Sequence, residues 1–333
     1  MTARWTSALA CFVLAVAGLV AAPEADAAET YTVTVHITAS PSAHVGATLT
    51  VSGSVTNGSG GVAAATLTIK RTDERTGATE TLAPMMTGAD GSFSAPDPQP
   101  AVWGYESYDV TASDTNGSGA GHSSLWISRY STTLTITSTR SVVSAGSLAH
   151  VTAHLGTTDT NRTVTIYARP YRRDRTQIRS GAVDATNGDL SATYTMERRT
   201  RFIAYFAGDQ KYRPASAYVV VLARAVVHEH LRGGYATSGK YRLYHSGANP
   251  VLAVHMLPEL DGVCLEFLAQ RYYNGAWHRD AVGCVRTDVY GRAIGVLTGD
   301  HHLYSPYRAR ARWGGSAAVL ARTGAWQYLK FRP

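Results

Sequence analysis

The sequence predicts an all-β protein made of consecutive β-sandwich domains. Polar and apolar residues alternate through most of the chain beyond the N-terminal segment, as they do in strands that bury one face. Turn signals built from Gly, Asn and Asp separate these runs at intervals of about 8–12 residues. Apolar stripes at helical spacing are missing from the same part of the sequence. Together these observations favour many short antiparallel strands.

The first 28 residues have the features of a secretory signal peptide. Arg4 supplies a positive charge, residues 8–22 are apolar, and Ala25-Asp26-Ala27 matches the small-x-small cleavage pattern. A membrane anchor needs about 20 apolar residues, whereas this run stops at Pro23. We therefore expect residues 1–28 to be cleaved and the mature protein to be secreted, either extracellular or associated with the cell envelope, with no membrane attachment.

An internal repeat of about 95–105 residues organises the mature chain. Gly46 precedes an alternating strand, and Gly146 precedes a similar one a hundred residues later. The turn dipeptide Asp90-Gly91 is matched by Asn187-Gly188, and each comes before an apolar residue that we expect to point inward. The repeat therefore predicts two related domains.

A third, more divergent unit keeps the ending of the other two. Residues 307–315 parallel residues 200–208, and each unit then closes with another alternating strand. The predicted domains are residues 29–129, 130–225 and 226–333. Each has about seven short strands per hundred residues, which is typical of an immunoglobulin-like β-sandwich.

Three motifs carry a resemblance to a known family. They are the Gly-led second strand, the (Asp/Asn)-Gly-x-apolar turn, and the aromatic-x-Ala-x-aromatic-x-Gly-Asp strand at residues 202–209. With them, the whole mature chain resembles the secreted immunoglobulin-like repeat proteins of actinobacteria, and the use of 27 Arg against 4 Lys fits such a source. The resemblance implies a stalk, spacer, adhesin or carbohydrate-associated module, and it brings no catalytic residues.

Charge is distributed unevenly along the chain. Residues 30–129 contain four Lys or Arg against eight Asp or Glu, whereas residues 130–225 contain thirteen against six and residues 226–333 thirteen against seven. This asymmetry indicates that any contact with a polyanion involves the second and third domains. A solvated surface that only keeps the protein soluble is the alternative.

Two cysteines remain after cleavage, and both lie in the third domain. An even number in an exported protein predicts a disulfide between Cys264 and Cys284. The hairpin signal between them, around Asn274-Gly275, predicts a loop of three residues that places the two cysteines directly opposite each other. A two-residue loop would offset them, so the bridge favours the longer turn or a bulge.

No motif of an enzyme active site occurs in the sequence. It contains no nucleophile elbow, P-loop or zinc-protease helix, and its carboxylates are scattered singly at turns. We therefore expect a non-enzymatic protein without a cofactor. His228 and His230 share one face of an extended strand and are weak candidates for a metal site, since no third ligand is evident.

Two segments are candidate binding surfaces, because Arg interleaved with aromatic residues suits phosphate, carboxylate and sugar groups. The first is an Arg-Tyr hairpin in the second domain, and the second is an aromatic hairpin with an Arg strand in the third. The candidates are Arg169, Tyr171, Arg172, Arg173 and Arg175, and then Tyr272, Tyr273, Trp277, Arg308, Arg310 and Arg312.

The function predicted from the sequence is a structural or binding module at or near the cell envelope. Its expected partner is a cell-wall polymer, a glycan or another protein rather than a specific nucleic acid. An accessory or cryptic domain of a polysaccharide-acting enzyme and a histidine-based metal-binding protein remain as alternatives. The first of these requires two carboxylates flanking a cleft.

Overall fold

A computed structural model describes residues 28–156 and 162–333, in which all regular secondary structure is β-strand. The predicted all-β sandwich fold is therefore confirmed. No helix in these two ranges is long and apolar enough to cross a membrane. The predicted signal peptide lies outside the described residues except for its last position. The chain divides into two compact units, one ending at Ser128 and the other beginning at Arg129.

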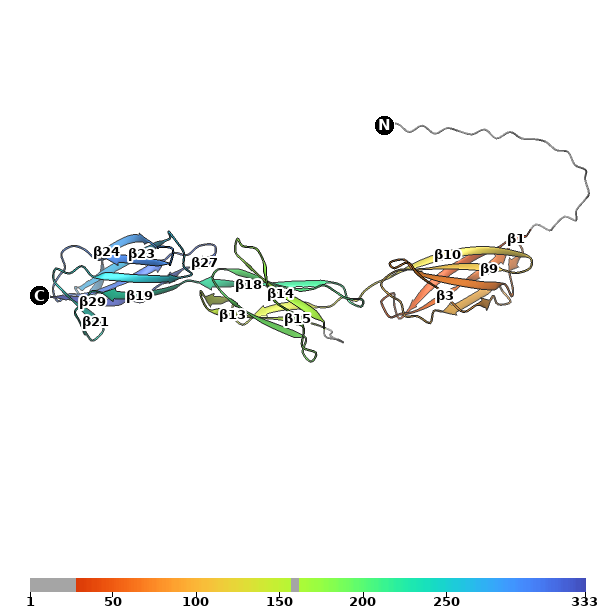
Figure 1. Cartoon of the computed structure of the whole chain (residues 1–333), viewed down its shortest axis with the longest axis horizontal. Helices are drawn as coiled ribbons and strands as arrows, with labels where there is room; N and C mark the ends of the chain where they lie inside the picture. Colours follow the sequence, from red (N-terminus) through yellow and green to blue (C-terminus); the bar gives the residue numbers. More distant parts are fainter. Residues whose placement is uncertain (1–27, 157–161) are drawn as a thin grey trace, which may run out of the picture. The chain divides into compact units, whose positions relative to one another are not determined.

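The first unit is one sandwich of two sheets (Figure 1). The larger sheet has the order β1-β10-β9-β5-β6, with β7 also paired to β5. Its strands are β1 (Glu29–Thr30), β5 (Thr66–Asp73), β6 (Ala78–Thr81), β7 (Met85–Met86), β9 (Gly104–Ser113) and β10 (Gly117–Ile127). The facing sheet contains β2 (Thr32–Ser40), β3 (Thr48–Asn57), β4 (Gly60–Gly61) and β8 (Ser92–Pro96).

The core of the first unit also contains a buried ionic network. Arg71 donates two hydrogen bonds of 2.9 Å to the carboxylate of Glu106 and lies 3.3 Å from that of Asp97. The hydroxyl of Tyr108 donates to Asp97 at 2.5 Å. Such burial is tolerated because each charge has a partner of opposite sign within 3.3 Å and each carboxylate accepts a hydrogen bond.

The second unit begins with a sandwich that has the same plan. Its smaller sheet is β11-β13-β16, formed by β11 (Leu134–Ser138), β13 (Leu148–Leu155) and β16 (Asp189–Thr195). Its larger sheet is β12-β18-β17-β14-β15, formed by β12 (Val142–Ser144), β14 (Thr163–Pro170), β15 (Thr176–Ala182), β17 (Thr200–Phe206) and β18 (Ala215–Arg224).

The last sandwich, also in the second unit, has the largest sheet of the three. The smaller sheet is β19-β22-β25, formed by β19 (Val226–Arg232), β22 (Val251–Leu257) and β25 (Arg292–Val296). The seven-stranded sheet has the order β20-β21-β29-β26-β23-β24, with β28 also paired to β26. Its strands are β20 (Ala236–Ser238), β21 (Tyr241–His245), β23 (Cys264–Tyr273), β24 (Ala276–Arg286), β26 (Pro306–Trp313), β28 (Arg322–Thr323) and β29 (Gln327–Arg332).

A short strand joins the two sandwiches of the second unit. β27 (Val319–Leu320) belongs to the last segment of the chain but pairs in parallel with Ala223 and Arg224 of β18. The backbone N–H of Ala225 donates to Leu320 at 3.1 Å, which extends the pairing. Because the last sandwich contributes a strand to a sheet of the one before it, these two sandwiches pack as one compact unit. The domain boundaries themselves stay predictions.

Candidate functional site

The predicted Arg strand of the last sandwich is β26, and its side chains alternate as expected. Tyr307, Ala309, Ala311 and Trp313 are buried. Arg308, Arg310 and Arg312 occupy the intervening positions, where they are half-buried or exposed. Directly paired residues of antiparallel strands share a face, so the outward face of the neighbouring β23 and β24 carries Gln270, Tyr272 and Trp277.

On this face two tryptophans and two arginines form a chain of cation–π contacts. The guanidinium carbon of Arg308 lies 4.4 Å from the ring centre of Trp277 and 4.1 Å from that of Trp326. Arg310 lies 4.0 Å from the same Trp326 ring. The Nε of Arg308 also donates to the side-chain oxygen of Gln270 at 2.7 Å. We call Trp277, Arg308, Trp326 and Arg310 the Trp–Arg ladder.

Further aromatic rings and lysines flank the ladder. Tyr272 and Tyr328 lie 5.2 and 6.2 Å from Trp277, between ring centres. Lys240 lies 4.2 Å from the ring centre of Tyr328, and Lys330 lies 4.2 Å from that of Tyr241. We call the ladder together with Tyr241, Tyr272, Tyr328, Lys240 and Lys330 the ladder face.

The cations of the ladder face form no direct ion pairs within the described part of the chain, although the charge of Arg310 acts on the buried Glu229. Among the described residues, no carboxylate forms a salt bridge with Arg308, Arg310, Lys240 or Lys330. Stacking uses the flat surface of a guanidinium and leaves in-plane N–H groups as donors. The ladder therefore holds positively charged donors in fixed positions on a half-exposed surface.

A buried carboxylate lies beneath the ladder strand. Glu229 of β19 accepts a hydrogen bond from the backbone N–H of Ala311, whose carbonyl in turn accepts from Gly324 at 2.9 Å. Burial raises the pKa of Glu229 to about 7, against the opposing effects of the Ala311 N–H and the charge of Arg310. A Cβ at Gly324 would lie 2.2 Å from this carboxylate, so the segment leading to Trp326 rests on the Glu229 side chain.

The Arg-Tyr hairpin of the second domain forms a different hollow. Arg169 of β14 is directly opposite Arg201 of β17, a like-charge pair that disfavours the fold unless something neutralises it. Arg172 and Arg199 line the same hollow of about 440 Å³. Arg199 lies 4.7 Å from the ring centre of Tyr171, and Arg201 lies 3.6 Å from that of Tyr218. We call these six residues the arginine cup.

Contacts from both sandwiches position the cup. The backbone N–H of Tyr171 donates to Arg199 at 2.8 Å, and the N–H of Arg199 donates to Ala318 of the last sandwich at 2.6 Å. Arg172 has a positive φ of 56° at the tip of the hairpin, an uncommon conformation for a residue with a side chain. The tip is therefore tied to the same junction that β27 makes.

Four predicted site residues lie outside these two clusters. Arg173 follows the turn at Pro170, and Arg175 lies over Tyr167 at 4.8 Å rather than in the cup. Tyr273 stacks on His278 at 4.0 Å between ring centres, on the opposite face of its hairpin from Tyr272. Arg312 is exposed on the outward face, beyond the end of the ladder.

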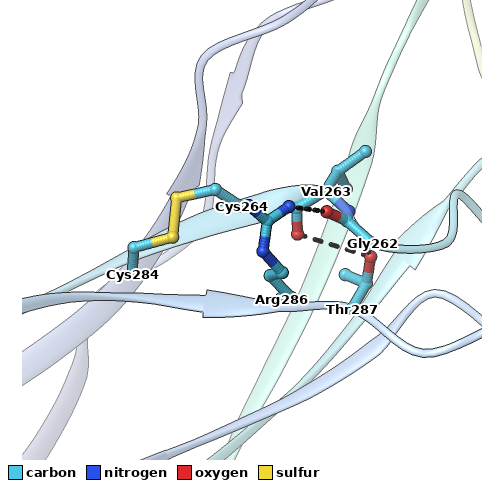
Figure 2. The surroundings of a disulfide bond; sticks show 6 residues. All are labelled: Gly262, Val263, Cys264, Cys284, Arg286 and Thr287. Atoms are coloured by element: carbon cyan, nitrogen blue, oxygen red, sulfur yellow. Dashed lines mark hydrogen bonds between the residues drawn. A yellow bond between two sulfur atoms is a disulfide. The ribbon is translucent and has the colours of Figure 1, made fainter.

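The disulfide between Cys264 and Cys284 is present, but its predicted register is wrong (Figure 2). The loop has two residues, Asn274 and Gly275, with φ of 49° and 78°, as a type I′ turn requires. A bulge then adds Asp280 to β24, so that Cys264 is opposite Arg286 and Glu266 is opposite Cys284. The bridge therefore runs diagonally, between Cα atoms 5.6 Å apart.

The histidine pair lies as predicted, on one exposed face of β19. His228 is directly opposite His255 of β22, and Nε2 of His230 accepts from Arg232 at 2.8 Å. In the described part of the chain, no cluster of three or more His, Cys, Asp or Glu has the arrangement of a metal site.

Four hollows of the second unit do not meet the requirement for two carboxylates in a cleft. Within the described residues they contain between them one carboxylate residue, Asp288. Its carboxylate accepts the backbone N–H groups of Tyr290 and Arg292 at 2.9 Å, as expected of an Asp that stabilises a turn.

Sequence reasoning missed several residues of the two clusters. They are Trp326, Tyr328, Tyr241, Lys240, Lys330, Arg199, Arg201 and Tyr218. Alternation along the closing strand of residues 326–331 would have placed Trp326, Tyr328 and Lys330 together on one face. Their contact with β26 depends on the order of strands in the sheet, which alternation does not define.

Comparisons with known proteins add no family assignment. No family model matches the chain, and no curated protein matches it. Among solved structures, a tetra-tandem repeat from the extending region of a large adhesion protein is 16% identical with a TM-score of 0.45, over 89% of this chain and 74% of that one. Trypsin-activated α-2-macroglobulin from Escherichia coli is 11% identical with a TM-score of 0.26, over 91% and 23%.

The FN1–FN3 domains of chicken CNTN1 are 9% identical with a TM-score of 0.25, over 92% of this chain and all of that one. No functional conclusion follows from these likenesses.

Proposed function

We propose that this chain is a secreted, non-enzymatic binding module that contacts an acidic polymer at or near the cell envelope. The ladder face is the main contact, and the arginine cup is the second. The observation that carries the proposal is the Trp–Arg ladder, in which Trp277 and Trp326 hold Arg308 and Arg310 without a salt bridge to any carboxylate of the described residues.

The arrangement favours acidic groups over neutral sugars. A neutral sugar binds aromatic side chains through the open face of a ring, and the ring of Trp326 has Arg308 and Arg310 at 4.1 and 4.0 Å. What the ladder offers instead is guanidinium N–H donors, which form strong, directional hydrogen bonds to phosphate, sulfate or carboxylate. Arg308 and Arg310 are two residues apart on one strand, a spacing of about 6.6 Å, so they suit a polymer with repeated charges.

Binding to defined polymers tests this proposal. Polyphosphate, heparin and neutral dextran would be titrated into the mature protein by calorimetry at about 0.05 and about 0.5 M salt. We expect both polyanions to bind, dextran to bind weakly or not at all, and high salt to weaken binding. The double variant Arg308→Gln/Arg310→Gln should bind about tenfold more weakly or worse, since two charge-assisted contacts are lost.

The control is Arg292→Gln, which removes one positive charge, against two in the ladder variant, from the smaller sheet of the same sandwich. Arg292 also lies over a ring, 5.3 Å from the centre of Tyr290. If the control weakens binding as much per charge as the ladder variant, the contact is a diffuse charge effect and the ladder has no special role. Equal binding of dextran and polyphosphate would contradict the preference for acidic polymers.

A further inference from the structure

The exposed edge of β24 differs from the edges of the corresponding sheets. Within the described residues, β24 pairs only with β23, so the other side of its backbone has no strand partner. The corresponding edge strand β6 has only four residues, and β15 carries Arg179 within it. Short length and charge are common ways to protect an edge from pairing. β24 has eleven residues, and its charged residues and its bulge lie outside residues 281–285, which are uncharged.

Apolar surface is exposed beside this edge. Val282 is 53% exposed, and Ile294 and Val296 of β25 are 53% and 51% exposed. An apolar cavity of about 180 Å³ is lined by residues of both strands, including Val282 and Val296 but not Ile294. A Cβ at Gly283 would meet no atom within 4 Å, which places open space at the centre of the uncharged stretch. An edge with these properties favours pairing with another strand.

The charges around the uncharged stretch are self-complementary. When two copies of β24 pair antiparallel with Gly283 opposite Gly283, Asp280 of each copy is opposite Arg286 of the other. The same register places His278 opposite Asp288. A shift by one residue in one direction puts Arg279 opposite Arg286, and a shift by two in the other puts Asp280 opposite Asp288. Like charges in those positions disfavour these two shifted pairings, whereas a shift by one residue in the second direction exchanges the Asp280–Arg286 pairs for Arg279 opposite Asp288.

We infer that the chain forms an antiparallel homodimer through β24, with its twofold axis at Gly283. Asp280 and Arg286 are both exposed. Arg286 donates from its Nη1 to the carbonyl of Gly262 at 2.6 Å, beside the start of β23 (Figure 2), and its other N–H groups have no hydrogen-bond partner among the described residues. The disulfide from Cys284 to Cys264 fixes the strand against β23 and limits fraying of the edge.

The dimer has a consequence for binding that rests on the proposed function. Edge-to-edge pairing continues the seven-stranded sheet across the axis, and the outward face of that sheet carries the ladder. Both ladder faces of the dimer therefore lie on the same side of one continuous sheet. A polymer long enough to reach both gains affinity through effective concentration, without any new contact.

Sedimentation velocity of the mature protein over a range of concentrations tests the dimer. We expect wild type to show a concentration-dependent dimer and Asp280→Arg to be monomeric, because the arginine introduced in each copy then faces Arg286 of the other. Arg286→Asp should be monomeric for the corresponding reason. An equimolar mixture of the two variants should dimerise again, since the introduced arginine meets the introduced aspartate and the native Asp280–Arg286 pair is retained.

Two further variants separate this interface from others. Val282→Lys should abolish the dimer without altering the ion pairs, whereas Arg312→Glu, on the outward face of β26, should leave it intact. A monomeric wild type at the highest soluble concentration would overturn the inference, and so would dimers of Asp280→Arg alone. A monomeric variant that keeps ladder-dependent binding to short polyphosphate would show that the proposed function does not depend on the dimer.

Discussion

Protonation of Glu229 should control the stability of the last sandwich near neutral pH. Burial raises the pKa of this carboxyl from 4.5 to about 7 in the folded protein. Between these values the unfolded chain releases the proton and the folded chain keeps it. The free energy of unfolding should therefore fall as pH rises from about 4.5 to about 7, and level off above that.

The magnitude follows from the shift. One pKa unit corresponds to 1.36 kcal/mol, so the full effect is about 3 kcal/mol, and it is an upper limit because the side chain is only partly buried. Glu229→Gln removes the charge but keeps an oxygen that accepts from the Ala311 N–H. The variant should resemble wild type near pH 4.5 and be more stable by about 2–3 kcal/mol at pH 8.

Urea unfolding at several pH values would measure this difference, with hydrogen exchange across residues 306–313 to report the last sandwich separately. His301 acts in the opposite direction, since burial lowers its pKa and favours the folded state as pH rises. The quantity to compare is therefore the difference between variant and wild type, with Asp261→Asn at an exposed position as the control. A Glu229→Gln difference that stays constant from pH 5 to pH 8 would refute the reasoning.

Three other perturbations have defined outcomes. Replacing Cys264 and Cys284 by Ser should destabilise the last sandwich by about 3 kcal/mol, because the bridge closes a loop of about 20 residues; urea unfolding should show no change in the first unit. Arg71→Met should cost the first unit about 3–5 kcal/mol by leaving Glu106 and Asp97 buried without their cation, whereas Lys70→Met, at an exposed position on the same strand, should cost little. Gly324→Ala should destabilise by about 1–3 kcal/mol through the contact with Glu229, and a Glu229→Ala background should remove most of that cost if the contact is its cause.

Alternation along single strands explains what could be predicted from the sequence. It correctly separated the buried Tyr307 and Trp313 from the outward Arg308 and Arg310 on β26. Alternation does not predict how neighbouring strands pair or in which register. The bulge at Asp280 leaves little trace in the pattern. Together with the two-residue loop, it makes Cys264 and Cys284 a diagonal pair instead of the direct pair that we predicted.

The same limit explains the missing half of the ladder. Trp326 lies close to Arg308 and Arg310 only because β29 adjoins β26 in the sheet, and that order is set by the packing of the whole sandwich. The sequence analysis also missed Glu229, which lies between the two histidines of β19. With His228 and His230 facing outward, alternation required Glu229 to face inward, yet an inward carboxylate is rare enough that composition gives no reason to expect it.

The last sandwich differs from the other two in a core residue of its smaller sheet, and this difference lies next to the exposed edge of β24. After equivalent turn glycines, the inward residue is Phe93 in the first sandwich and Leu190 in the second, but Ala293 in the third. Volume lost on this smaller sheet is partly restored from the facing sheet by Phe267, whose ring lies so close to Gly295 that a Cβ there would be 2.2 Å away.

The space that Phe267 leaves unfilled is the apolar cavity between β24 and β25, next to the edge that we infer forms the dimer. The sandwich with the smaller core residue at this edge is also the one whose large sheet carries the Trp–Arg ladder. A self-pairing edge and a binding face on the same sheet are structurally compatible, because pairing uses backbone groups in the plane of the sheet and the ladder uses side chains perpendicular to it. Variants of Asp280 and of Arg308 should therefore have independent effects on assembly and on binding to short polymers, and should become coupled only when a polymer is long enough to reach both ladder faces.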